Sequence, residues 1–278
     1  MMTMQTESPA QLDHLCVEST QPAVLARFYR DLLDCDESVV EQGFLMRGPR
    51  RAVLIRPAPT CGLAYAAYRL RDGNDLEKLR SRATAHGVAC EPLHDPLFEQ
   101  GAFAVADPQG RRTAFGVSCG TPARRGAPAR LQHTVYQTTE LEQIVRFYVE
   151  KLGFSISDEV VSESGGASVV FMRSDDEHHS LAFFKGSRNE WDHHCYETNE
   201  WNDIRDWGDR FAAAQIPIFF GPGRHGPGNN LFFMVTDPDG NRLEFSAELQ
   251  SVSADAAPGV WPEGERTLNS WGRAWMRS

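Results

Sequence analysis

The stretch Leu131-Gln132-His133, with Arg146-Phe147-Tyr148 and Leu152 after it, repeats an earlier part of the same chain. The first copy reads Leu12-Asp13-His14, then Arg27-Phe28-Tyr29 and Leu33, and each of these pairs is separated by 119 residues. The ends of the copies also match, because Asp107–Phe115 resembles Asp237–Phe245. A constant offset over several motifs indicates an internal repeat, so the chain contains two modules.

Hydrophobic spacing within each module predicts the order of its elements. In the second module, alternation over 131–135 predicts a strand, and apolar residues from Leu141 to Leu152 predict a helix that Gly153 ends. Further β-rich runs and one more amphipathic helix, over 201–211, follow. We therefore expect an α+β fold of tandem βαβββ modules. The expected bounds are 10–118 for the first module, 119–129 for a linker, 130–248 for the second module and 249–278 for an aromatic tail.

Composition narrows the possible functions. A chain of 278 residues with 41% hydrophobic residues can build two packed cores. Its net charge of −10 repels nucleic acid and anionic lipid, and no basic run offsets it. We find no signal peptide or 18-residue apolar run, and the six cysteines form no CxxC pair. These features predict a cytoplasmic enzyme or binding protein with neither a nucleic-acid nor a membrane partner.

The two copies differ where chemistry is expected. The first module has Ala114 at the position of Glu244, and its Leu63–Ala67 segment has no histidine where the second module has His194. His133, His194 and Glu244 therefore become candidate metal ligands. Two imidazoles and one carboxylate can occupy one face of an octahedral metal, which leaves room for substrate and O₂ in non-haem Fe(II) oxygenases.

Each candidate also has a structural explanation. A single strand histidine is commonly a hydrogen-bonded structural residue, and we expect this of His14. His193 and His194 point to opposite faces of one strand, so no more than one of them can be a ligand. Glu244 lies between apolar residues and would be costly to bury without a cation. We interpret Cys195 as a core residue.

Four ordered stretches of the second module resemble the vicinal oxygen chelate superfamily, and within it the type I extradiol catechol dioxygenases. They are Leu131–Val135, His179–Phe183, His193–Tyr196, and Gly221–Gly226 with Asp237–Glu244. The resemblance implies paired βαβββ units around Fe(II) or Mn(II), bound by His133, His194 and Glu244. It also implies an aromatic diol and O₂ as substrates, and a homo-oligomer.

The same resemblance assigns roles around the metal. It implies that His179 lies beside bound dioxygen as an acid or base and that His225 hydrogen-bonds the substrate hydroxyl region. Extradiol enzymes generally carry a tyrosine where this chain has Met234, which cannot donate a hydrogen bond. Tyr196 could replace that hydroxyl. Further candidates for substrate contact are Phe232, Trp191 and His193.

The working hypothesis is therefore an extradiol dioxygenase that cleaves a catechol-like ring. Two alternatives remain open: a divalent-metal isomerase, lyase or glyoxalase-like enzyme that uses the metal only as a Lewis acid, and a binding protein without turnover. The tail contains Trp261, Trp271 and Trp275, which is too much apolar surface for a free segment. We expect it to pack across the module, cap the site or mediate self-association.

Overall fold

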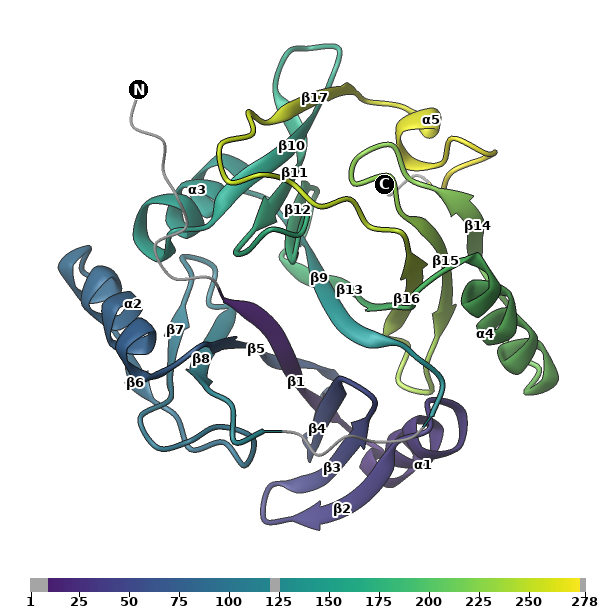
Figure 1. The fold of residues 1–278 in the computed structure, drawn as a ribbon, viewed down its shortest axis with the longest axis horizontal. Helices are drawn as coiled ribbons and strands as arrows, with labels where there is room; N and C mark the ends of the chain where they lie inside the picture. The colour runs from purple at the N-terminus through teal and green to yellow at the C-terminus, as the bar shows by residue number, and fades with distance from the viewer. Residues whose placement is uncertain (1–9, 121–125, 276–278) are drawn as a thin grey trace.

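Two twisted β-sheets lie side by side and form the body of the protein (Figure 1). The structure is a computed structural model, and it describes residues 10–120 and 126–275. The expected linker falls partly outside these ranges, at residues 121–125. No helix within the two described ranges is both long and apolar enough to cross a membrane.

Each sheet is assembled from two βαβββ units. The first unit comprises β1 (Gln11–Ser19), α1 (Pro22–Leu32), β2 (Asp36–Val40), β3 (Gly43–Gly48) and β4 (Arg51–Pro57). The second comprises β5 (Gly62–Leu70), α2 (Gly73–Ala85), β6 (Glu91–Pro92), β7 (Phe103–Ala106) and β8 (Arg112–Val117). The expected α+β fold of tandem βαβββ modules is confirmed.

The second sheet repeats this plan. Its first unit comprises β9 (Arg130–Thr138), α3 (Leu141–Arg146) continued by the π-helix η1 (Phe147–Leu152), β10 (Ser155–Val161), β11 (Ala167–Arg173) and β12 (Leu181–Lys185). Its second unit comprises β13 (Glu190–Glu197), α4 (Trp201–Ala213), β14 (Phe220–Arg224), β15 (Leu231–Thr236) and β16 (Arg242–Ala247). As predicted, Gly153 ends the helix, with a positive φ of 81° that suits glycine.

The strand order brings the ends of the repeat together. The second sheet runs β14-β15-β16-β13-β9-β12-β11-β10-β17, so β16, β13 and β9 are direct neighbours at its centre. Within it, Cys195 of β13 lies opposite both His133 of β9 and Glu244 of β16. Residues 133 and 244, far apart in sequence, therefore share one face of the sheet.

One hydrophobic core joins the two modules. Side chains from both sheets and from α1 and α4 form it, including Tyr29, Phe183 and Phe211. Hydrogen bonds also cross between the modules, for example from Tyr68 Oη to the Ser180 carbonyl at 3.0 Å. One face of the second sheet thus packs into this shared core.

The C-terminal segment completes the second module. Its strand β17 (Gly259–Pro262) adds to the edge of the sheet in parallel with β10, and the short helix α5 (Glu265–Leu268) follows. Both lie across the open side of that module in Figure 1. Of the three arrangements expected for the tail, two are seen for residues 259–268: this segment packs across the module, and part of it caps the pocket.

Candidate metal centre

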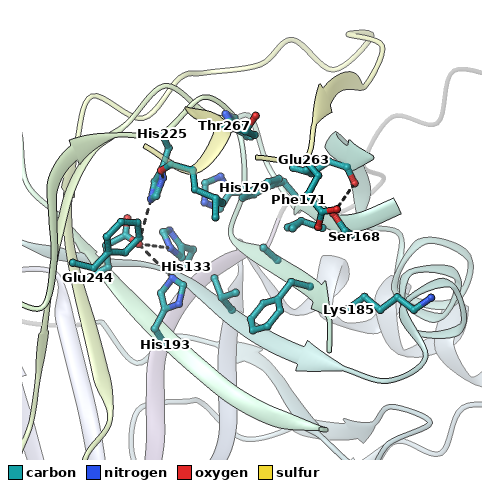
Figure 2. A pocket seen from close by; sticks show the side chains of 18 of the residues that line it. His133, Ser168, Phe171, His179, Lys185, His193, His225, Glu244, Glu263 and Thr267 are labelled. Atoms are coloured by element: carbon teal, nitrogen blue, oxygen red, sulfur yellow. Dashed lines mark hydrogen bonds and ion pairs between the residues drawn. The ribbon is translucent and has the colours of Figure 1, made fainter. Parts of the chain in front are cut away.

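A cluster of imidazoles around one buried carboxylate lies on the inner face of the second sheet (Figure 2). Oε2 of Glu244 is 3.3 Å from Nε2 of His193 and 3.8 Å from Nε2 of His133. These side chains come from the adjacent strands β16, β13 and β9, and all are almost fully buried. Two imidazole nitrogens and a carboxylate oxygen therefore converge on one point, which is a donor set suited to Fe(II) or Mn(II).

The prediction that His194 joins this cluster is wrong. Successive side chains of a strand point to opposite faces, and here the inward one is His193. The His194 ring stacks on Trp191 at 5.1 Å between centroids, and its Nε2 lies 3.2 Å from the Tyr29 hydroxyl of the first module. Burial lowers the pKa of His194 to about 3, so this ring is a neutral part of the core between the modules.

Electrostatics favour a charged Glu244. Burial alone would raise the pKa of its carboxyl, but contacts with His193 and His225 outweigh this effect and hold the pKa well below its usual range. The second oxygen, Oε1, accepts a hydrogen bond of 3.1 Å from Asn230 Nδ2. Burial lowers the pKa of His133 to about 3, so this imidazole is neutral and can offer a lone pair.

Cys195 lies beneath the cluster. A ligand atom from each of His133, Cys195 and Glu244 lies within 4.8 Å of the others, which makes the thiol a geometric candidate for a ligand. However, burial raises the pKa of this thiol well above its usual value, and Sγ donates a hydrogen bond of 3.0 Å to Ser246 Oγ. A metal binds the thiolate form, so His193 is the better third donor.

Two further histidines, His179 and His225, border the cluster. The ring of His179 lies 4.5 Å from that of His133, centroid to centroid, and Nε2 of His225 lies 3.9 Å from Glu244 Oε2. Nδ1 of His225 hydrogen-bonds to the Leu268 carbonyl of α5. Burial and nearby His133 lower the pKa of His179 well below its usual value, so it is neutral. Both rings line the same pocket as the carboxylate.

The residues expected to contact substrate divide into two groups. Met234 of β15 and His193 line the pocket. Tyr196 and Trp191 do not, because they lie with His194 on the opposite face of β13, where Tyr196 is fully buried beside Phe245. Phe232 also lies behind the pocket wall, where its ring stacks on His225 with 3.8 Å between centroids. Tyr196, Trp191 and Phe232 are therefore supporting residues, and the predicted substrate contacts are wrong for them.

Away from the histidines, the pocket is apolar. It has a volume of about 130 Å³, and the C-terminal segment covers part of it. Its apolar wall residues are Val135, Val160, Val169, Phe171, Ala182, Phe184, Phe220, Pro227, Met234 and Leu268. Figure 2 shows Lys185 and Glu263 far from the cluster, and both are exposed. A bound molecule would therefore meet nitrogen and oxygen ligands at one end and hydrocarbon along its length.

The first module carries a different group at the equivalent position. There His14, Ala67 and Ala114 lie opposite one another in the register that His133, Cys195 and Glu244 have in the second module. His14 Nε2 lies 2.9 Å from Asp95 Oδ2, to which Tyr65 also donates a hydrogen bond. As expected, His14 is structural: a buried ion pair occupies the place of the metal centre.

Comparisons with known proteins agree with this geometry. The model of the Glyoxalase/Bleomycin resistance protein/Dioxygenase superfamily matches residues 130–245. Metapyrocatechase 2 of Cupriavidus necator is 30% identical over 250 residues, which cover 76% of this chain and 72% of that protein. The manganese-dependent 2,3-dihydroxybiphenyl 1,2-dioxygenase of Geobacillus genomosp. 3 is 28% identical over 292 residues, covering 94% and 92%. The chain belongs to the extradiol dioxygenases of this superfamily, and the resemblance seen in its motifs is confirmed.

A solved structure supports the fold separately. The Mn(II)-bound glyoxalase from Novosphingobium aromaticivorans superposes with a TM-score of 0.85 at 22% identity, covering 96% of this chain and 92% of the glyoxalase chain. The same fold therefore occurs in a protein named as a glyoxalase, and the fold alone does not specify the reaction.

Sequence reasoning missed several residues of the site. Asn230, which donates to Glu244, and the pocket-lining Thr267 of α5 gave no signal in the pattern. No role was assigned from the sequence to His178, which is buried at 2% exposure. The choice of His193 over His194 had no local signal, because β13 is buried on both faces.

Proposed function

We propose that this chain is an Fe(II)-dependent extradiol dioxygenase that opens the ring of a catechol carrying an apolar substituent. The observation that carries the proposal is the convergence of His133, His193 and Glu244 at the inner end of an apolar pocket. The carboxylate is buried among imidazoles, and Lys185, the one lysine or arginine among the described residues that line the pocket, lies far from it (Figure 2), so the site fits a divalent cation. Mn(II) fits the same donors.

Iron, when bound, would bring the two hydroxyls of a catechol and O₂ into one coordination sphere and link them electronically. The side chains of the pocket would supply the hydrogen bonds to the substrate and the proton transfers. His225 presents Nε2 to the cluster because its Nδ1 is bonded to Leu268, so it is placed to hydrogen-bond a substrate hydroxyl. His179 is neutral and lines the same space, so it can accept and return a proton.

The overall reaction inserts both atoms of O₂ and breaks a ring bond next to one hydroxyl-bearing carbon. No reductant is consumed, since the ring supplies the electrons. Met234 has no proton to donate, so His179 and His225 carry the proton transfers in this site. The apolar wall limits the access of water to a molecule bound in the pocket.

The wall also indicates the substrate's substituent. A carboxylate placed among Val169, Phe171 and Phe184 would lose its hydration without gaining a partner, which costs several kcal/mol or more. An alkyl or aryl group there would instead gain about 25 cal/mol per Å² of buried apolar surface. We therefore expect alkyl- and arylcatechols as substrates, in preference to catechols with an acidic side chain.

A substrate panel tests this proposal. Oxygen uptake by the iron-loaded protein should give a kcat/KM at least about tenfold higher for 4-ethylcatechol than for 3,4-dihydroxybenzoate, because each 1.4 kcal/mol of difference is tenfold. The Lys185→Met variant should leave this ratio unchanged, since Lys185 lies at the exposed end of the pocket. A preference for the acidic catechol that this variant abolishes would contradict the assignment.

A Lewis-acid enzyme is the second candidate, and Met234 is the observation in its favour. Without a phenol at this position, the pocket lacks a hydroxyl group that extradiol enzymes generally have. Such an enzyme would not require a redox-active metal, so Zn(II) could support it, and it would not consume O₂. Activity with iron but not with zinc, together with O₂ uptake, would exclude it.

A further inference from the structure

A pair of adjacent buried histidines leads from the pocket into the protein. His178 and His179 lie in the segment between β11 and β12, at 2% and 3% exposure. Their Nδ1 atoms are 2.9 Å apart, a hydrogen-bond distance, and the two rings are perpendicular. Since Nδ1 of His179 is bonded to His178, Nε2 is the nitrogen that His179 has left for the pocket.

A carboxylate lies at the far end of this pair. Oδ2 of Asp158, on β10, is 3.0 Å from Nε2 of His178. Burial raises the pKa of Asp158, but His178 and the hydrogen bonds it accepts outweigh this and keep the pKa below its usual value. Asp158 is therefore an acceptor of hydrogen bonds and not a donor.

The C-terminal strand holds Asp158 in place. Oδ1 accepts a hydrogen bond of 3.0 Å from the backbone N–H of Gly259, and Oδ2 accepts one of 2.6 Å from Trp261 Nε1. The Trp261 ring packs on Gly226 so closely that a Cβ there would lie 2.9 Å from Cζ3. Strand β17 thus fixes the carboxylate and at the same time contacts the loop that carries His225.

This arrangement determines which nitrogen of His179 carries a proton. The Asp158 carboxylate, whose Oδ2 lies 3.0 Å from Nε2 of His178, favours a proton on that nitrogen electrostatically, which leaves Nδ1 of His178 as a bare acceptor. Of two facing Nδ1 atoms one must donate, and this is then the one on His179. A neutral His179 protonated on Nδ1 presents an unprotonated Nε2 to the pocket.

We propose that Asp158 and His178 are positioning residues that hold His179 with a proton-accepting Nε2 facing the substrate. This inference rests on the proposed role of His179 in proton transfer. In the dioxygenase, His179 would take up a substrate proton at Nε2 while its Nδ1–H remains bonded to His178. Partners that orient metal-ligating histidines typically change affinity or activity by about 10- to 100-fold when removed, and we expect an effect of this size for His179.

The first test is independent of activity and metal. Long-range ¹H–¹⁵N NMR spectra of the metal-free protein, labelled with ¹⁵N-histidine, report which ring nitrogen of each histidine is protonated. The His179→Asn and His178→Phe variants assign the two signals. We expect the Nδ1–H form of His179 in the wild type and a substantial Nε2–H fraction in Asp158→Asn. An Nε2–H form in the wild type would overturn the proposal.

The second test is a double-mutant cycle on the iron-loaded enzyme. His178→Phe keeps a ring of similar shape without nitrogens, and we expect it to lower kcat/KM for O₂ by about 10- to 100-fold. Anaerobic affinity for catechol should change less than about twofold, since His178 does not line the pocket. Combined with His179→Asn, the His178→Phe change should cause no further loss, because it acts only through His179.

Matched controls separate this role from a general structural one. Glu159→Gln removes the neighbouring carboxylate of β10 and should leave all of these values unchanged. Losses that multiply in the double variant would overturn the inference. If the wild type cleaves no catechol, the proposed function fails, but the NMR experiment still decides whether Asp158 and His178 set the protonation of His179.

Discussion

The imidazoles of His193 and His194 leave β13 on opposite faces and belong to different parts of the protein. His193 Nε2 lies 3.3 Å from the Glu244 carboxylate, whereas His194 Nε2 lies 3.2 Å from the Tyr29 hydroxyl in the first module. Of the next two residues, Cys195 lies on the same face as His193, beside Glu244, and Tyr196 lies on the same face as His194. One strand thus presents ligands to the pocket and core residues to the interface between modules.

This relationship predicts opposite results for two adjacent substitutions. His193→Ala should abolish iron binding and oxygen uptake, because it removes one of three donors. His194→Phe should retain about one iron per chain, as in other single-metal sites of this donor set. It should lower the free energy of unfolding by about 1–3 kcal/mol, since the Tyr29 hydroxyl loses its buried partner.

Metal analysis and urea unfolding of the two variants check this prediction. Loss of iron in His194→Phe with a normal unfolding transition would contradict the placement of the two rings. So would full iron content in His193→Ala.

Met234 lies opposite Glu244 on the neighbouring strand and lines the pocket. Because its thioether donates no proton and Leu has a similar volume, we expect Met234→Leu to keep kcat within about tenfold, the equivalent of about 1.4 kcal/mol. Steady-state oxygen uptake is the measurement. A loss above a hundredfold in a variant that still binds iron would show that the sulfur has a specific role.

His225 is fixed from two sides, by the stacked ring of Phe232 and by the Leu268 carbonyl. We expect His225→Gln to lower kcat by about a hundredfold or more, the usual effect of removing a group that assists proton transfer. The exposed His86 offers a matched control, and His86→Gln should behave as the wild type. Equal activity of the two variants would remove His225 from the mechanism.

The ion pair of the first module predicts a pH-dependent stability. Burial lowers the pKa of His14, but Asp13 and Asp95 outweigh this and raise it from 6.5 to about 9. A raised pKa in the folded state means that the stabilisation is complete below pH 6.5 and is lost as the pH rises through about 9.

Urea unfolding of the wild type and of His14→Gln, near pH 6 and near pH 9.5, tests this prediction. The rise in the His14 pKa corresponds to a few kcal/mol of folding free energy, which such a measurement can detect. The stability difference between the two proteins should shrink at the higher pH. A difference that is the same at both values would indicate that His14 is neutral.

The repeat and the hydrophobic periodicity were sufficient to predict the tandem βαβββ modules, because both are properties of local sequence. The same repeat located Glu244, whose counterpart is Ala114, and the structure places it with His133 on one face. Choosing between His193 and His194 required the register of β13 against β9, which has two irregularities. A strand buried on both faces has no polar alternation to indicate that register.

The contact between Asp158 and Trp261 could not be predicted from the sequence either. They are 103 residues apart and meet only because β17 adds to the edge of the sheet beside β10. The three tryptophans predicted that the tail packs on the protein, but not where. Homo-oligomerisation stays a prediction.

The most direct test of the central claim is anaerobic iron loading followed by metal analysis and oxygen uptake with 4-ethylcatechol. We predict about one iron per chain and about one O₂ consumed per catechol, with a yellow ring-opened product. His193→Ala should lose the iron, the uptake and the product together, and His194→Phe should keep all three. A chain that binds iron through these residues but consumes no O₂ with any alkyl- or arylcatechol would contradict the account.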